Sequence, residues 1–509
     1  MRFNIGTKRA NKVKNYEGAD AYTMSPALEL YASVVTTSLG DKFYESDQKR
    51  VQRLRELIAK NDPQFVAKLA IYAREQMYLR SVPLVLAVEL AKVHRGDSLV
   101  SRTVARVVQR ADEITELLAY YAVANGRNKA KKLNLLSKQV QKGLAEAFNK
   151  FDEYQLAKYN RATEVKLKDA LFLVHPKAKD EAQQALFNKL INDELAMPYT
   201  WETSLSARGQ QSFANAEEKR AAFRASWEEL IDSGKLGYMA MLRNLRNILE
   251  AEVSADRLRK VCTVLGDARA VVRSKQLPFR FLAAYREIKT LNRDESTQVL
   301  NALEAAARAS AENIPGFDES VRVLIACDVS GSMQRTISPK SKVQNYDIGL
   351  MLGMLLQHRC RRVTTGIFGD RWKVINLPQG NILANVDELH RREGEVGYST
   401  NGYLIIRDLI NRRAVVDKVM IFTDCQLWNS NGYGASNRET IAQMWGQYKQ
   451  IAPNAKLYLF DLAGYGNTPL DTRGNDVFLI AGWSDKVFAV LQAIEQGGQA
   501  VAEIKKIAL

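Results

Sequence analysis

The chain contains few of the residues that carry most metal and nucleophilic chemistry. Its 509 residues include only four cysteines and four histidines. The cysteines form no CxxC pair and do not have the spacing of a zinc site, so the sequence predicts neither a zinc module nor a disulfide framework. This cysteine usage favours a reducing, cytoplasmic compartment. Neither HExxH nor GxxxxGK[ST] occurs, which argues against two common classes of enzyme.

Long apolar runs and acidic residues are also in short supply. Residues 1–18 lack the apolar core of a secretory signal, and no run is long enough to predict a membrane span. Lysine and arginine number 73 against 57 acidic residues, a net charge of +16. Residues 1–315 carry +13 of this excess and residues 316–509 only +3. A nucleic acid is the favoured partner, an anionic membrane surface the second candidate, and an inert basic surface the alternative to both.

Residues 26 to about 310 have a helical pattern, with apolar residues three and four apart and short connections. Pro63 and Pro83 suit the first turns of helices. The pattern predicts stacked helix pairs of the HEAT or armadillo kind, although no strict repeat period is visible. Residues 1–25 are polar and basic, and we expect an extended arm or loop there.

Basic segments interrupt this helical pattern, and they supply the candidate RNA-binding residues. Cations, an aromatic ring and a histidine around a turn can bind phosphates and stack on unpaired bases. The alternative for these segments is a solvated basic face with a capping histidine. For the polar stripe of the helix at residues 238–248, the alternative is a set of hydrogen bonds between helices. The candidates are Arg74, Arg80, Lys158, Arg161, Lys166, Lys168, His175, Arg243 and Arg246.

The pattern changes near Pro315-Gly316, where short apolar strands begin to alternate with helices. We therefore predict two domains, residues 1–315 and 316–509. The alternation predicts a mostly parallel sheet with helices on both faces, which is a doubly wound α/β fold. Gly369-Asp370 lies between two strand-like runs and predicts a hairpin that adds one antiparallel edge strand.

Oxygen-bearing side chains follow three segments of this predicted sheet. Asp328, Ser330 and Ser332 come at the end of the first strand, Thr400 opens a helix, and Asp424 ends a later strand. Ligands bind at the carboxyl edge of such sheets, and Mg²⁺ prefers oxygen ligands. The sequence thus predicts a divalent metal site, with Mg²⁺ as the expected ion and an open position for a partner's carboxylate or phosphate. Two carboxylates are too few for two-metal phosphoryl transfer, so we do not expect an enzyme.

The helical part resembles the TROVE module of the Ro autoantigen family. The matching strings are YAREQMYLRSVPLVLAVELA, LFLVHPK, GYMAMLRNLRNIL and LPFRFLAAY. The resemblance implies a closed ring of HEAT-like repeats that holds the single-stranded 3′ ends of misfolded RNAs in its hole and binds Y RNAs outside. It places Lys158, Arg161 and His175 in the segment that contacts RNA. It further implies a monomer that partners an exoribonuclease such as polynucleotide phosphorylase.

The second part resembles the von Willebrand factor A domain, a Rossmann-like fold with a metal-ion-dependent adhesion site. In that family, positions matching Ser330, Ser332 and Thr400 ligate the metal directly, and those of Asp328 and Asp424 often act through water. This sequence departs from the usual GGTxTG loop, so Ser399 is an alternative to Thr400. The two resemblances together predict an RNA-binding protein of RNA quality control or a ribonuclease scaffold. A metal-dependent protein-interaction adaptor is the alternative.

Overall fold

The computed structural model divides the chain into two compact units, and each is described by itself. The sheet unit comprises Met1–Leu54, Met241–Glu250 and Leu258–Glu503; the helical unit comprises Arg55–Ala240, Ala251–Arg257 and Ile504–Leu509. The predicted domain boundary at residue 315 stays a prediction. The residues that the structure describes are 11–37, 47–126, 136–160, 165–291, 293–312, 314, 316–337, 341–428, 439–497 and 499–509.

The described residues from 26 to 311 fold mainly as helices, as their periodicity predicts. They are α1 (Pro26–Val35), α2 (Asp47–Ala59), α3 (Pro63–Glu75), α4 (Ser81–Val93), α5 (Leu99–Val107), α6 (Ala111–Ala124), α7 (Lys138–Phe148), α8 (Glu153–Tyr159), α9 (Leu167–Val174), α10 (Glu181–Asn192), α11 (Trp201–Gly209), α12 (Ala216–Asp232), α13 (Tyr238–Arg243), α14 (Leu245–Glu250), α15 (Ala255–Gly266), α16 (Ala268–Ser274), α17 (Phe279–Lys289) and α18 (Ser296–Ala311).

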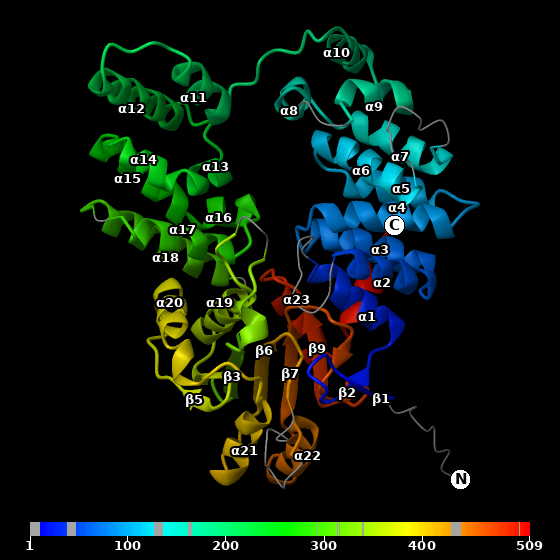
Figure 1. Ribbon diagram of the computed structural model, residues 1–509, viewed down its shortest axis with the longest axis vertical. Coiled ribbons are helices and arrows are strands. Elements are labelled where there is room, and N and C mark those ends of the chain that lie inside the picture. The colour runs from blue at the N-terminus through cyan, green and yellow to red at the C-terminus, as the bar shows by residue number, and fades with distance from the viewer. Residues whose placement is uncertain are drawn as a thin grey trace. The chain divides into compact units, whose positions relative to one another are not determined.

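Helices of the helical unit stack in sequence order. Helix α3 packs against α4 and α5, α4 also packs against α6, and α5 against α7 (Figure 1). Helices two positions apart in the chain thus pack side by side, which is the packing of stacked helix pairs. The buried apolar faces of α3 and α4 form much of this core. The expected helical-repeat fold is confirmed here.

The helical pattern of the sequence runs on through residues 99–124 and 238–248, but both stretches are broken in the structure. Residues 99–124 divide into α5 and α6 because Arg110 is extended, with φ −138° and ψ 148°. The Glu113 carboxylate accepts hydrogen bonds from the backbone N–H groups of Gln109 and Arg110 at 2.8 and 3.1 Å, which satisfies donors at the start of α6. The second break lies at Asn244, between α13 and α14.

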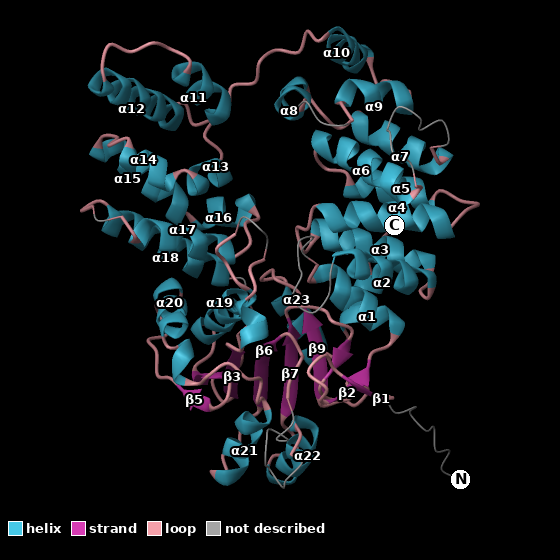
Figure 2. Cartoon of the chain, in the orientation of Figure 1, coloured by secondary structure: helices cyan, strands magenta, loops and turns pink. Residues whose placement is uncertain are grey.

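The C-terminal part is an α/β fold with a six-stranded sheet in the order β5-β4-β3-β6-β7-β9 (Figure 2). All neighbours are parallel except β5, which pairs antiparallel with β4 as the predicted hairpin requires. The elements are β3 (Arg322–Asp328), η2 (Gly331–Gln334), α19 (Asn345–His358), β4 (Arg362–Phe368), β5 (Trp372–Val374), α20 (Leu383–Arg391), η3 (Glu393–Glu395), α21 (Tyr403–Asn411), β6 (Lys418–Thr423), α22 (Ile441–Ile451), β7 (Lys456–Asp461), β9 (Val477–Ala481), α23 (Val487–Glu495) and α24 (Ala500–Lys505).

The central strands of this sheet are buried on both faces. Every residue of β3 after its first is buried, and β6 and β7 show the same pattern. Helix α19 packs on β3 and β6, where Gly353 allows close approach to Cys327. Neighbouring strands also stack Phe422 on Phe460, with ring centroids 4.3 Å apart. Continuous apolar strands are typical of parallel sheets with both faces covered, so the doubly wound fold is confirmed.

The N-terminal segment corrects one expectation, because its described part is a hairpin of the sheet unit and not a loose arm. Strand β1 (Lys12–Lys14) pairs with β2 (Asp20–Thr23), and β2 pairs with β8 (Asn467–Thr468). The Asn15 side chain shapes the turn by accepting hydrogen bonds from the N–H groups of Glu17 and Ala19. Because β8 is distant in sequence, local pattern alone does not predict this pairing.

No helix within the described ranges combines the length and the apolar character needed to cross a membrane.

Candidate metal site and RNA-binding surface

The five predicted metal-binding side chains lie at the end of a strand or on loops of the α/β part. Asp328 is the last residue of β3, and Asp424 follows β6, the parallel neighbour of β3. Ser330 and Ser332 lie in the turn of η2, and Thr400 precedes α21. All five are at most 4% exposed. Parallel pairing of β3 and β6 brings the two strand-end carboxylates to the same edge of the sheet.

Hydrogen bonds order the first of these loops. The Asp328 carboxylate accepts from the N–H of Ser330 at 3.0 Å and from the hydroxyl of Thr423 at 2.7 Å. The hydroxyls of Ser330 and Ser332 lie 3.3 Å apart. Two hydroxyl oxygens are therefore held next to a buried carboxylate whose orientation is restrained on both of its oxygens.

The second and third loops are joined through Gln426. The Thr400 hydroxyl donates to the Gln426 carbonyl at 3.0 Å, and the Gln426 N–H donates to Asp424 Oδ1 at 3.0 Å. Ser399, the alternative ligand, is half-buried, and its backbone N–H donates to Asp370 Oδ1 at 2.9 Å. The Thr400 side chain is buried and bonded to the segment that carries Asp424, whereas Ser399 is only half-buried. This favours Thr400 over Ser399 as the metal ligand of this loop.

The electrostatics of the site favour a cation. Burial raises the pKa of Asp328 to about 7, and the charge of Asp424 adds to this rise. Burial also raises the pKa of Asp424, and hydrogen bonds from the Gln426 N–H and the Ser332 hydroxyl oppose the rise. Asp424 Oδ2 is buried and has no hydrogen-bond partner among the described residues. A buried carboxylate oxygen without a partner is costly, and a divalent cation would satisfy it, so the donor set fits Mg²⁺.

Within the described ranges, no group of three or more histidine, cysteine, aspartate or glutamate side chains is arranged to hold a metal ion. The candidate site is of another kind, because three of its five side chains are hydroxyls. The assignment of its ligands therefore stays a prediction that the buried Asp424 oxygen supports.

Asp461 is a third buried carboxylate at this edge, and sequence reasoning did not single it out. It ends β7 and lies opposite Thr423 of β6. Its Oδ1 accepts hydrogen bonds from the N–H groups of Ala463 and Gly464, and its Oδ2 has no partner in the described structure. Burial raises its pKa to about 6. The signal in the sequence was the same as for Asp424, an apolar strand that ends in an acid.

In the helical unit, α8 presents a lysine beside two aromatic rings. Lys158 Nζ lies 5.5 Å from the ring centre of Tyr154 and 5.8 Å from that of Tyr159. The Arg110 guanidinium carbon lies 4.5 Å from the Tyr159 ring centre. Tyr154 is 45% exposed, and sequence reasoning missed both it and Arg110. Arg161 lies outside the described residues.

The other predicted residues of this segment are accessible. The side chains of Lys166 and His175 are exposed, and Lys168 pairs with Asp193 at 2.9 Å. His175 ends α9 in the left-handed region with φ 49°, and its backbone N–H donates to the Leu171 carbonyl. The backbone of His175, not its imidazole, therefore makes that hydrogen bond, and the ring faces solvent. We call Tyr154, Lys158, Tyr159, Lys166 and His175 the α8–α9 surface.

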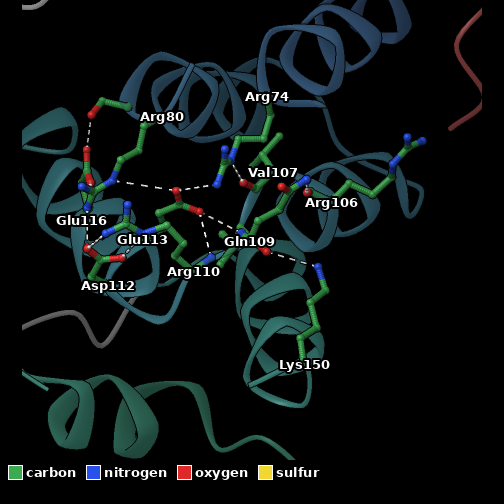
Figure 3. A network of polar contacts seen from close by, with 12 residues as sticks. Arg74, Arg80, Arg106, Val107, Gln109, Arg110, Asp112, Glu113, Glu116 and Lys150 are labelled. Atoms are coloured by element: carbon green, nitrogen blue, oxygen red, sulfur yellow. Dashed lines mark hydrogen bonds and ion pairs between the residues drawn. The ribbon is translucent and has the colours of Figure 1, made fainter. Parts of the chain in front are cut away.

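Arg74 and Arg80 take part in a polar network around Glu113 (Figure 3). Arg74 donates to Glu113 at 2.7 Å and to the Val107 carbonyl at 3.0 Å, and only 11% of its side chain is exposed. Arg80 is 41% exposed and pairs with Asp112 at 2.7 Å. The geometry gives Arg74 a structural role inside the helical unit. RNA contact by either arginine stays a prediction.

Arg243 and Arg246 belong to the sheet unit, whereas the other described RNA candidates belong to the helical unit. Arg246 pairs with Glu250 at 2.8 Å and with Glu287 at 2.7 Å, and Arg243 is exposed. Asn247 donates to the buried Asn244 at 2.8 Å. The alternative for this stripe was a set of hydrogen bonds between helices, and the bond from Arg246 to Glu287 of α17 is of that kind. Arg243 remains as an exposed cation beside it.

Stacked helix pairs joined to a doubly wound α/β part define a two-part helical-repeat protein. The model of the TROVE domain family matches residues 31–197 and 192–345, more than half of the chain. The chain therefore belongs to the TROVE domain family of RNA-binding proteins.

Known relatives and structures agree with this assignment. The chain is 26% identical over 369 residues to telomerase protein component 1 of Rattus norvegicus, a match that covers 57% of this chain and 13% of the relative. The Mus musculus protein is 26% identical over 325 residues, covering 51% and 12%. The crystal structure of the Deinococcus radiodurans RO (RSR) protein superposes with a TM-score of 0.58 at 18% identity. It covers 93% of this chain and 100% of that one. The likeness to this structure shows the fold. The chain spans only about an eighth of the length of the two telomerase protein components.

Proposed function

We propose that the protein binds structured non-coding RNA and holds single-stranded 3′ ends. The observation that carries this proposal is the TROVE match over residues 31–345. The net charge of +13 in residues 1–315 supports it, because cations that neutralise phosphates supply most of the affinity for nucleic acids.

The α8–α9 surface offers cations for the phosphates of RNA and an aromatic ring for its bases. Lys158 and Lys166 neutralise phosphates, and the exposed Tyr154 ring offers a face on which an unpaired base can stack. The exposed imidazole of His175 adds a donor or acceptor for a base edge. Stacking requires splayed bases, so single-stranded RNA is preferred over duplex.

The biological ligands we propose are a Y-like RNA and misfolded RNAs with free 3′ ends. The protein then acts in RNA quality control, or as a scaffold that brings RNA to an exoribonuclease. Purification from the native host followed by sequencing of the bound RNA tests this directly. Recovery of random messenger fragments without enriched 3′ ends would contradict it.

The binding test compares one structured RNA with a single-stranded 3′ tail and its blunt counterpart. We expect the tailed RNA to bind more tightly in a mobility-shift titration, and the affinity of both to fall steeply with salt. Equal, weak binding with little salt dependence would contradict RNA recognition by this chain.

The double variant Lys158→Ala with Arg161→Ala tests whether RNA binds at this part of the helical unit. If each contacts one phosphate of a single strand, the slope of log affinity against log salt falls by about 1.4. The matched control is Lys219→Ala with Arg220→Ala, which removes the same charge from exposed positions of α12. Equal losses in both double variants would mean that net charge, and not the α8–α9 surface, sets the affinity.

We also propose that the sheet unit binds one Mg²⁺ through Asp328, Ser330, Ser332, Thr400 and Asp424. The buried, unpartnered Oδ2 of Asp424 supports this. Bound Mg²⁺ supplies an open coordination position for an acidic group of a partner. The residues around it restrain the carboxylates and exclude bulk water, as their burial indicates.

A metal-dependent protein-interaction adaptor is the second candidate function, and the same Asp424 oxygen favours it. It predicts a protein partner that remains bound after ribonuclease treatment and is released by EDTA. Loss of that partner on ribonuclease treatment alone would contradict it.

A further inference from the structure

The turn of the β1–β2 hairpin lies on the segment 424–428, which carries Asp424. Three successive residues of the turn form hydrogen bonds with three residues of that segment, more than 400 positions away in the chain. The bonds are Asn15 Nδ2 to the Leu427 carbonyl at 2.8 Å, Tyr16 N–H to Gln426 Oε1 at 2.9 Å, and Trp428 Nε1 to Glu17 Oε2 at 2.6 Å.

The same segment positions two candidate metal ligands. The Gln426 backbone bonds to both Asp424 and Thr400, as described above. The N–H of Trp428 donates to the Thr400 carbonyl at 2.9 Å. Docking of the hairpin therefore restrains the backbone that holds Asp424 and Thr400, so the conformation of the site and the docking of the hairpin are linked.

The hairpin also brings a negative charge to the site. The indole that holds the Glu17 carboxylate belongs to Trp428, four residues after Asp424 in the same segment. Without a cation, the carboxylates of Glu17 and Asp424 repel each other. When a divalent cation is bound, both carboxylates attract it. Glu17 is partly buried, and the indole of Trp428 holds its carboxylate.

We propose that Glu17 is a positioning residue of the metal site: from the hairpin turn, its carboxylate increases the affinity for Mg²⁺ and couples metal binding to hairpin docking. This inference rests on the proposed Mg²⁺ site. By linkage, any gain in metal affinity from the docked hairpin is matched by an equal stabilisation of the docked hairpin by the metal. The surface formed by the turn and segment 424–428 is then part of the metal site, although it comes from opposite ends of the sequence.

The test measures Mg²⁺ affinity of the full chain by isothermal titration calorimetry. Glu17→Gln removes the charge but keeps an oxygen that can accept from the Trp428 indole. We expect its Kd to rise about three- to tenfold at low salt, and the difference to shrink at high salt, because the effect is Coulombic. The matched control is Asp20→Asn, on the same hairpin but paired with Lys14. Its Kd should stay within about twofold of wild type.

Hydrogen exchange supplies an independent readout. Mg²⁺ should slow exchange at residues 12–23 in the wild type and less so in Glu17→Gln. If Glu17→Gln also lowers the melting temperature without Mg²⁺, Glu17→Asp serves as the second variant, because it keeps the charge and should restore near-wild-type affinity. An equal loss of affinity in Glu17→Gln and Glu17→Asp would overturn the role of the charge. Wild-type Mg²⁺ affinity in Glu17→Gln, or an equal loss in Asp20→Asn, overturns the role of Glu17 while the Mg²⁺ site stands. No Mg²⁺ binding by the wild type overturns the site and the role of Glu17 together, while the RNA-binding proposal stands.

Discussion

Replacing Arg74 by methionine should destabilise the helical unit without removing an RNA contact. Glu113 is fully buried, and its ion pair with Arg74 is 2.7 Å long. Removing one partner of a buried pair costs about 3–5 kcal/mol because the other charge stays buried. Two backbone N–H groups and the Arg80 guanidinium, at 3.8 Å, still interact with Glu113. We therefore expect the lower end of that range, about 3 kcal/mol.

Hydrogen exchange is the suitable assay, because a chain with two compact units need not unfold in one transition. A loss of about 3 kcal/mol corresponds to exchange about a hundredfold faster at the most protected amides of α3 and α6. Arg80→Gln is the control: its side chain is 41% exposed, and the expected loss is under about 1 kcal/mol. Glu113→Gln added to Arg74→Met should recover part of the stability, since it removes the unpaired charge.

The refuting result is specific. If Arg74→Met exchanges like wild type but binds RNA much more weakly, Arg74 contacts RNA as the sequence predicted, and its ion pair contributes little. If RNA affinity is unchanged below the melting temperature while α3 and α6 exchange faster, the structural role stands.

Two further predictions concern other parts of the chain. Asp328→Ala should abolish stabilisation by Mg²⁺, which in the wild type reaches about 2.7 kcal/mol at one hundred times the Kd. RNA affinity should survive that change, and a melting shift retained by the variant would contradict the ligand assignment. Gly143→Ala should destabilise α7 although alanine ordinarily favours a helix by about 1 kcal/mol. A Cβ at Gly143 would lie 2.5 Å from the Ser101 carbonyl and 2.6 Å from Val104 Cβ, so a raised melting temperature would show that α5 and α7 can separate without cost.

Local periodicity was sufficient to predict the elements that depend on nearby residues. The strand that ends in Asp328 and the strand that ends in Asp424 form where their apolar runs predict them. The antiparallel strand after Gly369 also forms, because a tight turn between two strand-like runs leaves few other pairings. Order along the chain, with acids and hydroxyls after strands, was enough to propose the metal site.

Side-chain partners that are remote in sequence required the tertiary structure. Periodicity continues through residues 99–124, and only the bonds from Gln109 and Arg110 to Glu113 show why the helix breaks there. A basic residue in a sequence carries no sign of its partner, so the sequence could not separate the buried Arg74 from the exposed Lys166.

The sequence by itself determined the family, the helical and α/β character of its two parts, and the set of candidate metal ligands. These depend on composition, short-range periodicity and motif order, all of which are local. The tertiary structure alone decided that the hairpin around Glu17 packs on the segment after Asp424, and that Asp461 is a third buried carboxylate at the same edge. Such contacts join residues hundreds of positions apart, and their energies depend on burial and distance, which exist only once the chain has folded.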